Sequence, residues 1–290
     1  MRNSSAGIAL VSVLWLLMLL SGLAATVAYI TRVQAILARH SFDFARAQAA
    51  ADAAIVNTIA GLSDAQPDRR PASGAPQSWE FEGLPITIVV TREAGRIDVN
   101  KAHDDLLLAF FQVEGVTASA AANLLDQLRS RQTGGMSLRH MTGANQLTSP
   151  LETLEEVRQI PEWQGQHLDC WLSSLTVYSG QSEVDVSAAT PAALAALQWL
   201  QAHDPKRAKS PTATPGADTP SGPLLGEVVR IRALATGTEV FAISEWVGRL
   251  TGDRSTPMLT MRWDHGIPTE PATSCTPDTS AEPLDQPAPK

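Results

Sequence analysis

Apolar residues follow two different patterns over the first sixty positions of the chain. Between Ile8 and Thr31 no residue is charged, and all but five of the side chains are apolar. A helix needs about 20 apolar residues to cross the hydrocarbon core of a bilayer, so this run predicts a membrane-spanning helix. From Val33 to Leu62, apolar side chains recur every three or four residues, which predicts an amphipathic helix.

The two patterns join without a break. No proline lies between them, and the first glycine after Thr31 is Gly61. We therefore predict one helix from about Ile8 to Ala60, roughly 80 Å long at about 1.5 Å per residue. Two alternatives remain open: a cleaved secretory signal, for which residues 24–28 could supply the cleavage site, and a membrane anchor followed by an unrelated coiled segment.

The rest of the chain contains short strand patterns. Residues 79–81 and 86–90 alternate or run in β-branched residues, which predicts a hairpin. Residues 240–247 and 258–263 indicate a second antiparallel pair, whereas residues 226–234 are expected to form a short helix. The sequence therefore predicts both strands and helices after the first helix.

A short motif occurs twice. Residues 97–102 and 184–189 share the order apolar, Asp, Val, Asn or Ser, any residue, Ala, and in both copies a leucine follows nine residues after the aspartate. This predicts an internal repeat of strand, cap and helix. In the first copy, Asn100 is expected to cap the following helix, because its short side chain can accept hydrogen bonds from free N–H groups of the first turn.

Composition narrows the classes of function. The chain has 290 residues, of which 44% are hydrophobic and 18% charged, as expected of a folded protein. A net charge of -8 argues against general nucleic-acid binding, which depends on Lys and Arg neutralising phosphates. The two cysteines, Cys170 and Cys275, permit one disulfide. No metalloprotease, nucleophile-elbow or phosphate-loop motif is present in the sequence, so we do not expect an enzyme.

The N-terminal leader resembles that of type IV pilins and pseudopilins. It runs from Met1 to Gly7, is short and polar, and ends in glycine. The resemblance implies cleavage between Gly7 and Ile8 by a prepilin peptidase. Most of that family has Glu at the fifth mature position, where this chain has Ser12. The K-type minor pseudopilin of type II secretion systems habitually lacks this Glu and is placed at the filament tip.

Three later segments are similar to signatures of the K-type pseudopilins, namely residues 95–102, 154–161 and 175–179. With the leader, they extend the resemblance from Gly7 to about Trp263. It implies a single-pass protein of the bacterial inner membrane with a periplasmic domain. The implied partners are the I- and J-type minor pseudopilins, the major pseudopilin and the prepilin peptidase.

We predict an α+β fold in which a long transmembrane and spine helix packs on a small antiparallel, pilin-like sheet. A helical insertion resembles SAM and helix-hairpin-helix modules. The expected divisions are a leader (1–7), the transmembrane (8–31) and periplasmic (32–62) parts of the helix, strands (63–102), the insertion (103–174), a second repeat with further strands (175–265), and a disordered tail (266–290). Partners are expected to contact the apolar stripe of the spine helix at Val33, Leu37, Phe44, Ala47, Ala51 and Ile55.

The insertion admits a second function. Residues 110–124 resemble a helix-hairpin-helix, a module often used to grip DNA backbones, so a membrane-tethered DNA-uptake protein is the alternative. Such a grip needs exposed backbone N–H groups and nearby basic residues. Here Glu114 precedes the hairpin, and no Lys or Arg occurs from there until Arg129. The sequence therefore favours a structural module without a nucleic-acid partner.

Calcium is the one cofactor that the resemblance suggests, because related K-type proteins bind it in their helical domain. Calcium takes six to eight oxygen ligands, several of them from carboxylates. Between Asp126 and Glu152 the sequence contains no Asp or Glu. The ligands are therefore not evident, and we expect no metal site. An acidic cluster at Asp98, Asp104 and Asp105 is expected to serve the start of a helix.

Overall fold

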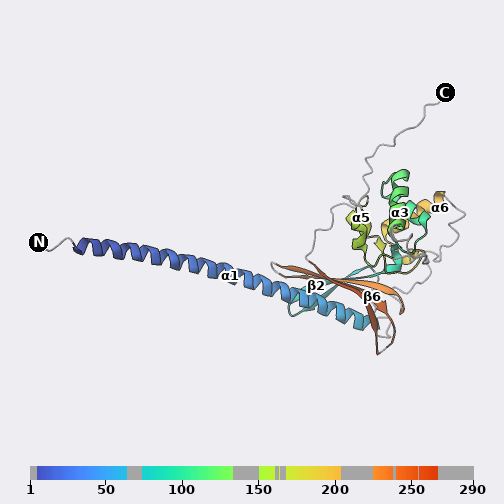
Figure 1. Cartoon of the computed structure of the whole chain (residues 1–290). Helices are drawn as coiled ribbons and strands as arrows, with labels where there is room; N and C mark the ends of the chain where they lie inside the picture. The colour runs from blue at the N-terminus through green and yellow to red at the C-terminus, as the bar shows by residue number, and fades with distance from the viewer. Residues whose placement is uncertain are drawn as a thin grey trace, which may run out of the picture.

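The computed structural model describes residues 5–63, 74–132, 150–160, 163, 168–203, 225–237, 240–253 and 255–266. The architecture is α+β, as predicted: a long helix, an antiparallel sheet and a helical unit at the far end of the sheet (Figure 1). Most of the predicted loop at 63–78, nearly all of that at 203–224 and almost the whole predicted tail lie outside the described residues.

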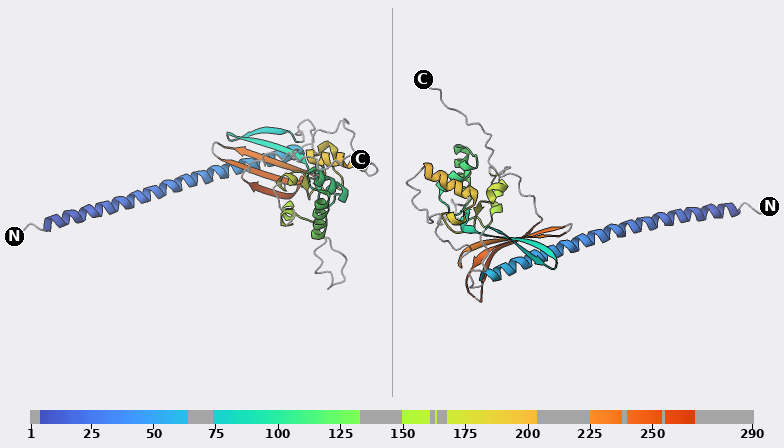
Figure 2. Two further views of the ribbon diagram at one scale, coloured as in Figure 1. Left: turned by 90° about the horizontal axis from the view of Figure 1, so that it is seen from above. Right: turned by 180° about the vertical axis from the view of Figure 1, so that it is seen from behind.

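Helix α1 (Ser5–Ser63) is continuous, which confirms the prediction that the apolar and amphipathic segments form one helix. Its 59 residues are about 90 Å long at 1.5 Å per residue. The N-terminal half projects alone, and the C-terminal part lies along the sheet in both views of Figure 2.

The sheet has five strands in the order β1-β2-β5-β6-β7, and all neighbours are antiparallel. The two predicted strand pairs are confirmed as β1–β2 and β6–β7. Their bounds are β1 (Pro76–Phe81), β2 (Leu84–Arg92), β5 (Val228–Thr236), β6 (Phe241–Leu250) and β7 (Met258–Gly266). The central strand, β5, therefore lies far along the chain from the β1–β2 hairpin with which it pairs.

The predicted short helix over 226–234 is wrong, because these residues form the central strand β5. Val229, Ile231 and Ala233 are fully buried and alternate with Arg230 and Arg232. This is the two-residue period of a strand. Leu, Ala and Arg are good helix formers, but here tertiary pairing on both sides overrides their preference.

The first hydrophobic core lies between α1 and the sheet. The helix contributes mainly small side chains, and the sheet contributes β-branched residues, alanines and Trp246. Alanine lets the helix backbone approach the strands closely. The buried helix positions are Ala47, Ala50, Ala51, Ala54, Ile55, Ile59 and Leu62.

A second hydrophobic core holds the helical unit together. Its helices are α2 (Asp104–Val113), α3 (Ala118–Gln132), η3 (Leu154–Gln159), α5 (Leu168–Leu172) and α6 (Pro191–His203). At its centre, Phe110, Phe111, Trp163 and Trp171 pack with ring centroids 5.1–6.5 Å apart. Aromatic pairs at such distances stabilise a core beyond the area they bury.

Packing groups the chain differently from the predicted divisions. Ile97 and Val99, placed with the strands, and Ala193 and Ala196 of α6, placed in the second repeat, are all buried in the core of the helical unit. Strands β3 (Ile97–Asp98) and β4 (Leu175–Thr176) form a small parallel pair of their own. The helical unit therefore extends from β3 to α6, beyond residue 174.

The two copies of the internal repeat share the hydrogen bond made by their aspartate. Asp98 Oδ1 accepts a hydrogen bond from the N–H of Asn100, and Asp185 Oδ1 accepts one from that of Ser187, both at 2.9 Å. The second copy forms a 3-10 helix, η5 (Val186–Ala188), where a strand was predicted. The predicted cap at Asn100 is wrong, since α2 begins at Asp104 after His103. Asn100 instead bonds to the backbone of Leu151.

Candidate assembly surface

The N-terminal part of α1 is exposed over the residues whose side chains the structure describes. Every described side chain from Leu10 to Asp43 is exposed, although most of those up to Ile30 are apolar. The most apolar stretch has a mean hydropathy of 2.3, and none of it is buried. This helix is long and apolar enough to cross a membrane.

The apolar stripe of the spine helix divides into two parts. Val33 and Leu37 are exposed to 37% and 60%, and Phe44 is half-buried. Ala47 and Ala51, like Ile55 beyond them, are buried under the chain's own sheet. The prediction that these last three contact a partner is therefore wrong. From Ala47 onward, the apolar side chains of the stripe pack in the chain's own core. Only the positions before Ala47 remain available to another protein.

A groove of about 480 Å³ lies beside the exposed part of the stripe, between α1 and the turns of the sheet nearest the N-terminus. Arg46 donates to the carbonyl of Glu82 at 2.6 Å and so joins the helix to the β1–β2 turn. The groove is lined by Ile36, Arg39, His40, Asp43, Arg46, Ala47, Leu84, Gly237 and Val240. The lining therefore includes both charged and apolar side chains.

The three segments that carry the resemblance meet at a joint between the sheet and the helical unit. Ile97 and Asp98, from the first segment, pair with Leu175 and Thr176, from the third. The second segment contributes Glu155 of η3, which accepts two hydrogen bonds from β7. The side chain of buried Asp98 also accepts from Ser179 Oγ and Gly180 N. These segments therefore position the helical unit on the sheet.

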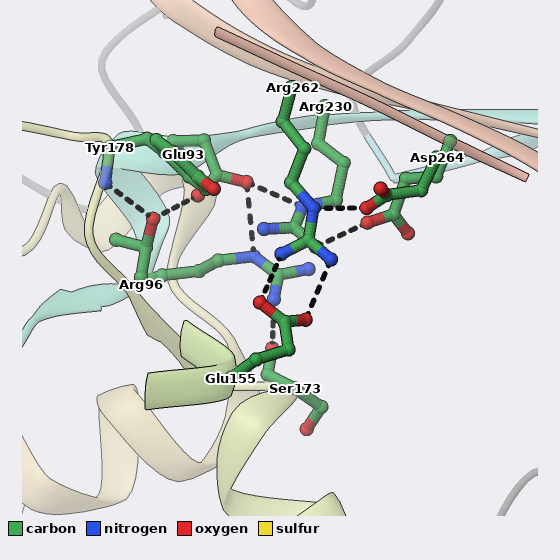
Figure 3. A network of polar contacts seen from close by, with 10 residues as sticks. Glu93, Arg96, Glu155, Ser173, Tyr178, Arg230, Arg262 and Asp264 are labelled. Carbon is green, nitrogen blue, oxygen red and sulfur yellow. Dashed lines mark hydrogen bonds and ion pairs between the residues drawn. The ribbon is translucent and has the colours of Figure 1, made fainter. Parts of the chain in front are cut away.

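Glu93 stands at the centre of the joint (Figure 3). It lies in the short 3-10 helix η2 (Glu93–Gly95) and is fully buried. Its carboxylate accepts from Arg230 Nε at 2.7 Å and from Thr176 Oγ1, and it lies 3.6 Å from Arg96 Nε. Burial alone would raise the pKa of Glu93, but the ion pairs with Arg230 and Arg96 hold that pKa below its ordinary value.

The arginines of the joint bind several elements at once. Arg230 of β5 also donates to Glu245 of β6 at 2.7 Å. Burial, and then repulsion from Arg230, lower the pKa of Arg96 to about 10, and Arg96 donates to the carbonyl of Ser173. Arg262 of β7 donates to both carboxylate oxygens of Glu155, at 2.6 and 2.7 Å. Bidentate pairs of this kind fix orientation as well as distance.

A second ion cluster also connects the sheet to the helical unit. Arg92, at the end of β2, is buried and donates two hydrogen bonds to Glu227, at 2.8 and 2.5 Å. It also lies 2.7 Å from Asp185 and donates to Ser187 at 3.1 Å. The second copy of the repeat is thereby attached to the sheet. Neither ion cluster could be predicted, because the only local signal in the sequence is the spacing Arg-Glu-x-x-Arg at 92–96.

The predicted helix-hairpin-helix is present as α2 and α3, joined by residues 114–117. Gly115 has a φ of +84°, a backbone conformation that favours glycine. The nearest basic residues of α3, Arg129 and Arg131, pair with Asp104 and Glu156 at 2.7 and 3.0 Å. Because these cations are already paired within the chain, the hairpin is poorly suited to hold phosphates, and the DNA-binding alternative is not favoured.

Calcium does not fit the described residues of the helical unit. No group of three or more His, Cys, Asp or Glu side chains gathers among the residues that the structure describes. Asp104 is paired with Arg129, and Glu156 with Arg131. Glu156 also accepts hydrogen bonds from the N–H groups of Glu152 and Thr153. These carboxylates therefore already have cationic or N–H partners.

The remaining predicted positions are untested. Gly7 and Ile8 lie inside α1, which begins at Ser5, and the exposed Ser12 follows one turn later. Cleavage between Gly7 and Ile8 stays a prediction. Cys170 lies in α5, whereas Cys275, with which the sequence permits a disulfide, lies outside the described residues.

Comparison with known proteins points to one fold. No family model and no curated protein matches the chain. A chain in the crystal structure of the GspK-GspI-GspJ complex from the enterotoxigenic Escherichia coli type 2 secretion system is similar, with a TM-score of 0.50 and 11% sequence identity. The match covers 82% of this chain and 99% of that chain. The protein therefore has the pilin-like α+β fold of a subunit from a type 2 secretion complex.

Proposed function

We propose that this protein is a minor pseudopilin of a type II secretion system. The observation that carries the proposal is the continuity of α1, whose exposed apolar half continues without a break into a half covered by the sheet. One helix thus serves as a membrane anchor and as the support of a periplasmic domain. The similarity to a chain of the GspK-GspI-GspJ complex supports the same role.

Within such a filament, the protein acts as the cap at the tip. Subunits stack through their spine helices, so a subunit that accepts a neighbour ahead of it must be slim at its far end. The helical unit lies at that end, on the side of the sheet away from α1 (Figures 1 and 2). Ser12 supports the same position. Most pseudopilins have Glu there, and a carboxylate within the bilayer is costly unless it pairs with a cation, such as the N-terminal amine of the subunit ahead. A subunit at the tip has no subunit ahead of it, so a neutral serine avoids that cost.

The proposed partners are the I- and J-type minor pseudopilins, which contact the exposed stripe at Val33 and Leu37. Leu37→Glu should reduce co-purification of these partners at least tenfold and leave the fold unchanged, because the Leu37 side chain is 60% exposed. Phe42→Glu is the matched control, since Phe42 is similarly exposed, at 69%, but lies about 140° around the helix. Equal co-purification of both variants at wild-type level would contradict the proposed interface.

Processing is tested separately. N-terminal sequencing of the membrane-extracted protein should find Ile8 as the first residue, as expected from a prepilin peptidase. An intact Met1 would contradict cleavage, and a start near Tyr29 would support a secretory signal. Counting this protein against the major pseudopilin in isolated filaments should give one copy per filament; many copies along the shaft would contradict the cap.

A further inference from the structure

Four oxygen atoms converge beside the last turn of α3. Two are backbone carbonyls, of Val99 and Ala102, in the turn between β3 and α2. The others belong to the carboxylate of Asp104 and the side-chain amide of Gln132. All four accept hydrogen bonds from one guanidinium group, that of Arg129. We call these four oxygens the oxygen cluster.

The guanidinium of Arg129 uses its three nitrogens on the cluster. Nη1 donates to Val99 O at 3.1 Å and to Gln132 Oε1 at 2.9 Å. Nη2 donates to Ala102 O at 2.8 Å and to Asp104 Oδ1 at 2.7 Å, and Nε donates to the same carboxylate oxygen at 2.9 Å. A lysine has three donors on a single nitrogen and could not reproduce this planar arrangement.

A second layer of hydrogen bonds connects the cluster to a distant part of the chain. Gln132 is buried, and its Nε2 donates to Val99 O at 2.9 Å and to Asn100 Oδ1 at 3.1 Å. Asn100 in turn bonds to both backbone groups of Leu151, each at 2.9 Å. Leu151 is buried in the core of the helical unit. The cluster therefore joins three segments of the helical unit.

Two carbonyls, an amide oxygen and a carboxylate around one point form an environment suited to a cation. A calcium ion would need more oxygens and further carboxylates than these four groups provide. A guanidinium is always charged and has a donor for each oxygen. We propose that Arg129 is a built-in cation that occupies the place of a bound ion, so that the helical unit folds without metal and the cluster binds free guanidinium when this side chain is removed.

The full chain in detergent micelles can test this, with near-ultraviolet circular dichroism reporting the buried tryptophans. The variants are Arg129→Ala and Arg131→Ala, a matched control on the same turn whose residue pairs with Glu156 at 3.0 Å. Arg129→Ala should melt about 5 °C below wild type. About 10 mM guanidinium chloride, but not sodium chloride, should restore at least half of this loss, as expected for a ligand of the native state.

Several results decide the proposal. The proposal is supported if guanidinium raises the melting temperature of Arg129→Ala but not that of Arg131→Ala. It also requires that neither a chelator nor added calcium changes the melting temperature of the wild type. The proposal is overturned if Arg129→Ala melts like wild type, if both variants respond alike to guanidinium, or if chelation lowers the wild-type melting temperature. Should Arg129→Ala fail to fold, Arg129→Lys should melt below wild type; a lysine variant as stable as wild type overturns the proposal.

Discussion

Removal of the Glu93 carboxylate should be among the most damaging single changes in the protein. In Glu93→Ala, Arg230 loses a hydrogen bond of 2.7 Å and Arg96 loses an ion pair of 3.6 Å. Loss of one partner from a buried ion pair costs about 3–5 kcal/mol, because the other charge stays buried. Arg230 keeps Glu245, so we expect a loss of stability near 3 kcal/mol, out of a total of about 5–15 kcal/mol for a typical protein.

Urea unfolding of the full chain in micelles, followed by tryptophan fluorescence, measures this loss. Glu93→Gln should lose less, about 2 kcal/mol, since the amide can still accept from Thr176. Glu80→Ala is the control: Glu80 is exposed on β1, and its replacement should change stability by less than about 0.5 kcal/mol. If Glu93→Ala costs less than about 1 kcal/mol, the reasoning that the joint depends on a buried carboxylate is refuted.

Three further predictions follow from the packing and charges. The pKa of native Glu93 lies below its ordinary value of 4.5. The ionised carboxylate therefore contributes its full stability above pH 4.5, and this contribution is lost as the pH falls through the native pKa. When unfolding is measured at decreasing pH, wild type should lose more stability than Glu93→Gln. Gly95→Ala should cost about 1–3 kcal/mol in urea unfolding, because its Cβ would lie 1.9 Å from the carbonyl oxygen of Ala188. Ala51→Glu, at a fully buried position, should prevent α1 from packing on the sheet. Rapid proteolysis of the sheet would report this change, whereas wild-type resistance to proteolysis would contradict the core assignment.

Local patterns in the sequence were sufficient to predict α1 and two strand pairs. The uncharged run and its amphipathic continuation identified α1, and alternation identified the β1–β2 and β6–β7 pairs. Strand β5 was missed because its alternating partner residues are arginines. Arg230 is largely shielded from solvent and pairs with Glu93, which lies 137 positions away in the sequence, and no local pattern contains that pairing.

The spine stripe shows a second limit of periodicity. Leu37 and Ala51 follow the same helical spacing, yet one is exposed and the other is covered by the chain's own sheet. An apolar face on a helix indicates that the face is covered, but it does not distinguish the chain's own sheet from another protein. Residue size is the available clue, because the covered positions are mostly alanines, which fit against a closely packed sheet.

The strand order has a consequence for the order in which the parts of the chain fold. Strand β5 pairs with β2 and β6, so the sheet cannot close until the whole segment between Arg92 and Val228 has been synthesised. Until then, the buried face of α1 has only the first hairpin to cover it, while the helical unit, with its separate core, can already condense. We expect the nascent protein to pass through a stage in which its helical unit is folded and the apolar face of α1 is still largely uncovered, a period in which another protein bound to that face would prevent aggregation.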